Sequence, residues 1–151
     1  MENLKTPTQL DVTSESNWET LSQQLNRGND DLFSGVVICN LLHCSPYRTQ
    51  DDIFSHLSHS NACESGETRI SGLLRNGGWV AMYGAFMTDD GSFASDGDEK
   101  FHQRFTGIHP DFGLRRIPDV ENVAKRYGFV LEKRIPMPAG NWMVVFRLLR
   151  T

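Results

Sequence analysis

The sequence predicts one α/β domain with an open, mostly parallel β-sheet and an antiparallel strand at its end. Segments with strand character alternate along the chain with segments of helical periodicity. The run 36–38 is β-branched and uncharged, as in a parallel strand covered on both faces. Residues 136–141 link the last two strands, and this link is too short for a parallel crossover. A length of 151 residues fits a single domain.

The first half of the chain predicts two strands and two helices. Residues 10–12 place an aspartate between two apolar residues and indicate a short strand that ends in a carboxylate. Residues 18–25 have apolar positions at helical spacing and predict a short amphipathic helix. The apolar run 33–42 predicts a strand in the middle of the sheet. A second apolar stripe at 51–57 predicts a helix, and the polar stretch 58–71 a surface insertion.

The second half continues this alternation after a long irregular segment. Residues 73–78 predict a turn into a strand over 79–83, which completes a βαβ unit with the strand before it. Residues 87–116 contain many acids and chain-breaking residues and predict a lid-like loop or a disordered tract. The sequence then predicts a helix that begins at Pro118 and ends at Gly128. Two antiparallel strands, 129–135 and 142–149, are expected to follow it.

Composition argues against several classes of function. The formal net charge is −4 and no more than two basic residues are adjacent, so the sequence lacks the basic surface that nucleic-acid binding needs. The three cysteines form no C-x-x-C pair, which indicates a reducing, cytoplasmic setting. No stretch reaches the ~18 apolar residues of a membrane span, so we expect no membrane partner.

Five short blocks, in one order, resemble a known family. The chain is similar from about residue 3 to residue 147 to the methyltransferase-like 26 family, which has the Rossmann-like class I S-adenosylmethionine-dependent fold. The blocks are Pro7-x-x-Leu10-Asp11-Val12-Thr13, Cys39-Asn40-x-Leu42-His43-x-Ser45-Pro46, Tyr83-Gly84-x-Phe86, Phe112-Gly113-Leu114-Arg115, and Met137-Pro138-Ala139-x-Asn141 followed by Val145-Phe146-Arg147.

The resemblance covers only the C-terminal two-thirds of the family's domain. It implies S-adenosylmethionine as cofactor and methyl transfer to an acceptor, small molecule or protein, that no residue identifies. The glycine-rich Gly-x-Gly turn that grips the cofactor in this fold does not occur in residues 1–151. We therefore expect an N-terminally truncated domain with impaired activity. Three origins stay open: an incomplete gene model or splice form, a stable non-catalytic relative, or a fragment completed by a partner.

Three residues are candidates for cofactor binding or for catalysis. By resemblance, Asp11 would accept a hydrogen bond from the adenine amino group, although the same carboxylate could cap the following helix. Asn40 follows the central strand and would shape the cofactor site at the carboxyl end of the sheet. His43 lies close behind it and is either a general base or a structural, hydrogen-bonded histidine.

Three further residues are candidates for the substrate pocket. Tyr83 and Phe86 follow the next strand and would wall the pocket or pack in the core. Arg115 would bind a carboxylate or phosphate from the lid-like segment. The family usually has an acid directly after this arginine, whereas this chain has Arg116.

Two alternatives lie outside the enzyme interpretation. Cys44, His56, His59 and Cys63 form a chemically possible zinc set, but their spacing matches no common finger, and we predict free thiols and surface histidines without a metal. The second alternative is a binding or regulatory protein without catalysis. An open sheet without its central strands exposes an unpaired strand edge, through which such a chain would form a homo-oligomer.

Overall fold

The computed structural model describes residues 6–25, 32–58 and 72–149. Their centre is a four-stranded sheet in the order β1-β2-β4-β3. The strands are β1 (Phe33–Cys39), β2 (Leu74–Ala85), β3 (Phe129–Pro136) and β4 (Asn141–Leu148). The α/β class predicted from the sequence is confirmed.

The two halves of the sheet differ in strand direction. β1 and β2 are parallel and are joined through helix α2 (Thr49–Leu57), so the predicted βαβ unit is confirmed. β3 and β4 are antiparallel, as the short link between them requires, and the 3-10 turn Pro138–Gly140 connects them. The sequence did not indicate that β4 inserts between β2 and β3 and runs antiparallel to both.

The first predicted strand is absent. Residues 10–12 lie in a turn before helix α1 (Glu15–Gln24). Asp11 Oδ1 accepts hydrogen bonds from the backbone N–H and the hydroxyl of Thr13, at 2.9 and 2.8 Å. Ser14 N donates to the Asp11 carbonyl at 3.1 Å. These local bonds compete with strand pairing, and no described strand lies beside this segment to offset them.

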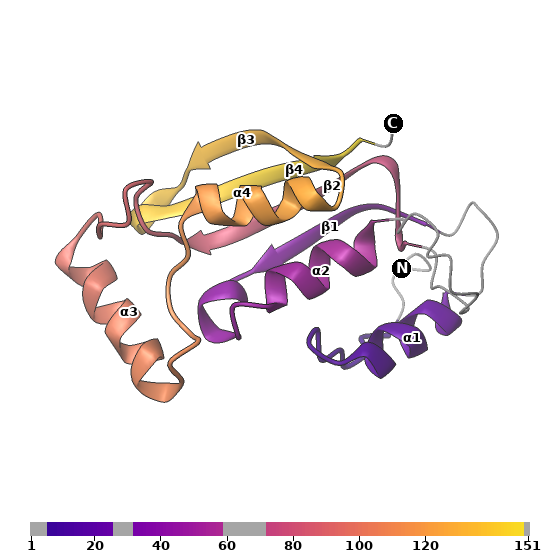
Figure 1. Ribbon diagram of the computed structural model, residues 1–151, viewed down its shortest axis with the longest axis horizontal. Coiled ribbons are helices and arrows are strands. Elements are labelled where there is room, and N and C mark those ends of the chain that lie inside the picture. The colour runs from indigo at the N-terminus through magenta and orange to yellow at the C-terminus, as the bar shows by residue number, and fades with distance from the viewer. Residues whose placement is uncertain (1–5, 26–31, 59–71, 150–151) are drawn as a thin grey trace.

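β1 is a strand at the edge of the described sheet, so its predicted place in the middle is wrong for this part of the chain. The prediction of cover on both faces is wrong as well. Val36 and Ile38 pack against the core, whereas Val37 between them is 58% exposed. Figure 1 shows α2 and helix α4 (Ile117–Arg126) on the same side of the sheet.

β2 begins earlier than predicted. The expected turn over 73–78 is mostly strand, since β2 starts at Leu74. The register with β1 jumps between the pairs Phe33–Leu74 and Gly35–Trp79, so β2 holds extra residues here. Gly77 takes a left-handed φ of 74° within this irregularity. Glycine signals of this kind mark a bulge as readily as a turn, which explains the difference.

The segment 87–116 is not a loop throughout. It contains helix α3 (Asp96–Ile108), which Ser95 caps by accepting a hydrogen bond from Asp98 N at 3.1 Å. Three acids in the first helical turn face the positive end of the helix dipole. No residue of α3 is fully buried, and the weak apolar stripe is the reason that the sequence pattern did not reveal the helix.

The C-terminal helix has the predicted form. Pro118 lies in the first turn of α4 and Gly128 follows its end with a left-handed φ of 79°. Val120, Val123 and Ala124 are buried against the sheet. Within the described ranges, no helix has the length and apolar character to cross a membrane.

The predicted insertion over 58–71 lies almost entirely outside the described residues, as do His59 and Cys63 of the possible zinc set. His56 is engaged elsewhere: its Nε2 lies 3.0 Å from Glu15 Oε2, and its ring stacks on Trp18 at 4.8 Å. The part of the chain that the structure describes contains no group of three residues able to hold a metal ion.

The core lies between the sheet and its two covering helices. Phe54 of α2 is fully buried and contacts Phe129 and Phe146, with ring centroids 4.9 and 5.3 Å apart. Its ring therefore joins α2 to both β3 and β4. Apolar burial of this size is the main favourable term in folding.

We expect Phe54→Ala to lower the free energy of unfolding by about 3–5 kcal/mol, because the substitution removes buried apolar surface and leaves a cavity. Ile108→Ala is the control. Ile108 is 66% exposed, so its truncation should change the free energy by less than about 0.5 kcal/mol. Urea denaturation followed by circular dichroism measures both; equal effects would contradict the placement of the core.

Candidate functional site

The carboxyl ends of β1 and β2 lie side by side, because the two strands are parallel neighbours. Cys39 pairs with Tyr83 in the register, and Asn40 N donates a hydrogen bond to the Tyr83 carbonyl at 2.8 Å. Open α/β sheets bind their ligands at this end of the strands. The structure therefore brings together, at one end of the sheet, the two sequence blocks that begin at the last residues of β1 and β2.

Asn40 and His43 converge on Gly84. Asn40 takes a left-handed φ of 52°, rare for a residue other than glycine. A Cβ atom at Gly84 would lie 3.4 Å from Asn40 Oδ1 and 3.8 Å from His43 Nδ1. Gly84 is thus part of the site and was missed as such in the sequence, although a glycine at the end of a strand can signal close approach of other groups.

His43 is buried beneath helix α3. It lies in the 3-10 turn Leu42–Cys44, and its ring contacts those of Phe101 and Phe105, with centroids 4.9 and 5.1 Å apart. Neither ring nitrogen has a hydrogen-bond partner among the described residues. Burial, and then the positive charge of Arg115, hold the pKa of His43 below its usual value. The imidazole is therefore neutral at neutral pH and can accept a proton.

Two aromatic residues at the end of β2, Tyr83 within the strand and Phe86 directly after it, line the same small cavity as Asn40, His43 and Gly84. Phe86 is 5% exposed and belongs to the hydrophobic core. Tyr83 is half-buried. Because side chains alternate along a strand, the Tyr83 ring lies on the face of the sheet opposite to that of Gly84. That these two residues wall a substrate pocket stays a prediction.

Arg115 is enclosed by backbone carbonyls. It is 1% exposed and donates hydrogen bonds to the carbonyls of Gly113, Ser45 (2.6 Å) and Asp111 (3.4 Å). Its guanidinium lies 4.0 Å from the centroid of the Tyr47 ring. Burial lowers the pKa of Arg115, but it remains charged. The side chain thus ties the segment after α3 to the turn after β1.

Asp11 lies apart from the other candidates. Its carboxylate is exposed and accepts the two hydrogen bonds from Thr13, which lower the pKa of Asp11 together with the nearby charge of Arg48. Arg48 Nη2 donates to the Thr13 carbonyl at 2.6 Å and so attaches this turn to the start of α2. No direct contact joins Asp11 to Asn40 or His43 in the described residues.

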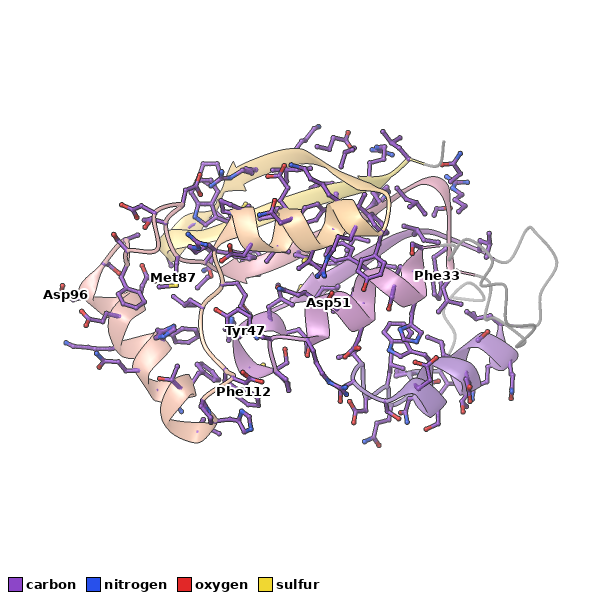
Figure 2. All side chains as sticks on the ribbon, in the orientation of Figure 1. Phe33, Tyr47, Asp51, Met87, Asp96 and Phe112 are labelled. Atoms are coloured by element: carbon purple, nitrogen blue, oxygen red, sulfur yellow. The ribbon has the colours of Figure 1, made fainter. Side chains whose placement is uncertain are left out.

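The cavity at this site is small. Its lining includes Asn40, His43 and Gly84 together with apolar residues of β1 and β2. The volume is about 10 Å³, which is the space that one water molecule needs. A nucleoside is far larger than this volume. Figure 2 shows the side chains around the site, where Met87 and Phe112 mark the two segments that flank α3.

Several solved methyltransferases resemble this chain in fold. An O-methyltransferase family protein from Burkholderia thailandensis has a TM-score of 0.58 at 15% identity, over 85% of this chain and 33% of its own. Human N-acetylserotonin methyltransferase, solved in complex with SAM, has a TM-score of 0.54 at 10% identity, over 78% and 30%. An O-methyltransferase family 2 protein from Planctomyces limnophilus DSM 3776, solved with apigenin, has a TM-score of 0.55 at 11% identity, over 77% and 30%.

These comparisons establish a methyltransferase-like fold, and the chain spans about a third of the length of these solved proteins.

The family comparison covers nearly the whole sequence. A family model described as "Protein of unknown function (DUF938)" matches residues 1–148. The chain belongs to the DUF938 family.

Proposed function

We propose that this chain is a methyltransferase-like protein that carries the acceptor side of a class I S-adenosylmethionine-dependent site and transfers no methyl group by itself. Membership in the methyltransferase-like 26 family, which the five sequence blocks resemble, is part of this proposal. The observation that carries it is the convergence of Asn40, His43 and Gly84 at the carboxyl ends of two parallel strands. The fold shared with solved methyltransferases supports it.

The described residues do not form a complete pocket for S-adenosylmethionine. Asp11 and Asn40 have suitable chemistry, because a carboxylate and an amide accept hydrogen bonds from amino and hydroxyl groups. However, the cavity beside Asn40 has room for one water molecule. Asp11 has no contact with that cavity's lining in the described chain. We therefore assign no chemical step to the cofactor here.

His43 is the candidate general base. Its ring is neutral at neutral pH, as its lowered pKa requires, and its nitrogens make no hydrogen bond among the described residues. An acceptor hydroxyl or amine beside this ring would lose its proton to a ring nitrogen as it becomes a nucleophile. The contacts with Phe101 and Phe105 hold the ring in place but also cover it. An acceptor therefore reaches His43 only when α3 moves.

Helix α3 has the features of a lid over His43. No residue of the helix is fully buried. Gly91 and Gly113, which lie on either side of α3, have left-handed φ angles of 89° and 121°. Glycines of this kind absorb backbone rotation at low cost. We propose that α3 rotates away from the turn Leu42–Cys44 to admit the acceptor.

The second candidate function is a binding or regulatory protein without catalysis. The open edge of β1 favours it, since the described sheet offers no strand partner on that side. Backbone carbonyls hold the Arg115 side chain in both candidates. A cytoplasmic location stays a prediction from the cysteine pattern.

Titration calorimetry tests whether the chain binds the cofactor. We expect no saturable heat when S-adenosylmethionine is added to the purified chain, because the cavity beside Asn40 cannot admit an adenosyl group. Saturable binding in the micromolar range, lost in both Asp11→Asn and Asn40→Ala, would contradict the proposed impairment and favour an active enzyme.

The pH dependence of stability tests the state of His43. Because its pKa is lowered in the folded chain, the unfolded chain binds a proton first as the pH falls below about 6.5. Stability is thus fully present above this pH and is lost as the pH falls. We expect wild type to lose more stability than His43→Phe between pH 7.5 and 5.5 in urea denaturation. Equal losses would contradict a buried neutral His43.

Chemical modification tests the lid. We expect Phe101→Ala to accelerate the reaction of His43 with diethyl pyrocarbonate several-fold, as measured by mass spectrometry of the His43 peptide, because the aromatic cover is removed. Ile108→Ala changes an exposed residue of the same helix and should leave the rate unchanged. The same acceleration in both variants, or in neither, would count against α3 as the cover of His43.

A further inference from the structure

Helix α3 lies apart from the other helices and is joined to the sheet by the segments before and after it (Figure 1). Two histidines at this helix accept hydrogen bonds from the segment that follows it. His102 Nδ1 accepts from the Leu114 backbone N–H at 3.1 Å, and His109 Nδ1 accepts from the Asp111 N–H at 3.1 Å. A ring nitrogen that accepts a hydrogen bond carries no proton. Both contacts therefore need a neutral histidine.

The His102 ring packs closely against the chain. It is half-buried, and a Cβ atom at Gly113 would lie 2.8 Å from its Nδ1 and its Cε1. Gly113 therefore leaves the space that the ring occupies. Phe93, which precedes α3, has its ring centroid 5.2 Å from that of His102. The imidazole thus contacts both segments that flank the helix.

The segment that His102 binds is also bonded to the turn that carries His43. Gly113 N donates a hydrogen bond to the His43 carbonyl at 2.9 Å. The Arg115 guanidinium donates to the Ser45 carbonyl at 2.6 Å. His102 therefore links α3 to a segment whose position is tied to that of His43.

We propose that His102 is a positioning residue of the candidate site: its neutral ring holds α3 over His43, and protonation of the ring releases the helix. The inference rests on the lid of the proposed function and names what regulates it. A proton added to the neutral ring occupies Nδ1, the atom that accepts from Leu114, and an imidazolium has two donors and no acceptor. Leu114 is 0% exposed, so its N–H would stay buried without this acceptor, which is unfavourable.

The direction of the pH effect follows from the role of His102 as acceptor. The closed position of α3 needs the neutral form of His102, whereas the open position accepts both forms. Acid therefore shifts the population towards the open position. Histidine is the side chain that ordinarily changes its charge between pH 5 and 8. His43 acts in the same direction, because burial and the charge of Arg115 lower its pKa.

Charged groups of both signs belong to the segments around His102. Asp98 and Glu99 lie in the preceding turn of the same helix. The segments packed against the helix contribute the titratable groups His43, Cys44, Asp111, Arg115 and Arg116. Carboxylates favour the protonated ring and cations oppose it. The hydrogen bond to Leu114 therefore decides which form the closed helix binds.

Amide hydrogen exchange, measured by NMR on the whole chain and divided by the intrinsic rate at each pH, tests this contact. In wild type, the protection of the Leu114 amide should fall several-fold between pH 7.5 and 5.5. His102→Asn should keep its protection at both pH values, because the amide oxygen accepts the same hydrogen bond and does not titrate. His102→Leu should lack protection at both, because leucine offers no acceptor. His109→Asn is the matched control and should follow wild type, since the His109 bond closes only the turn after the helix.

The amides of β4, which is paired on both sides, separate release of α3 from unfolding. Their protection should be the same in wild type and His102→Asn at each pH. If His102→Leu loses it, that variant is unfolded, and the comparison of wild type with His102→Asn decides alone. A fall in Leu114 protection as large in His102→Asn as in wild type, or no fall in wild type, would overturn the proposal.

Chemical modification at a fixed pH connects this contact to His43. At pH 7.5, His102→Leu should accelerate the reaction of His43 with diethyl pyrocarbonate several-fold, and His102→Asn should not. Equal rates in the two variants reject the role of His102. If Phe101→Ala still exposes His43 in that case, the lid of the proposed function stands without His102, so the two failures are distinguishable.

Discussion

The parallel pairing of β1 with β2 is the constraint on which the rest of the structure depends. It aligns the carboxyl ends of the two strands, so that Asn40 reaches the Tyr83 carbonyl and His43 lies near Gly84. It also leaves the other edge of β1 open. The same pair of strands therefore fixes where the candidate site lies in the sheet.

The packing of this sheet is one-sided. α2 and α4 cover one face, where Phe54 joins β3 and β4 to the core. On the other face, Trp79 lies across Gly35, where a Cβ atom would come within 2.2 Å of its ring. This contact explains the glycine in the middle of an edge strand, since any larger residue would displace the indole. The outer face thus has specific packing although no described helix covers it.

The candidate site combines two halves. The strand ends, the turn Leu42–Cys44 and the buried Arg115 form one half, in which the guanidinium binds carbonyls from two segments. Helix α3 contributes Phe101 and Phe105 but buries no residue completely. A buried, neutral histidine beneath a helix that has no fully buried residue is suited to chemistry that needs both a dry environment and controlled access.

The sequence by itself determined the α/β class, the βαβ unit, the helix 117–126 and the final antiparallel strands, because these follow from local periodicity and from link lengths. It also placed Asn40 and His43 behind a strand. Only the tertiary structure decided that residues 10–12 form a turn, that β1 lies at an edge, and that Arg115 and Phe86 are enclosed. Strand neighbours and burial depend on contacts between distant segments, which local patterns do not specify.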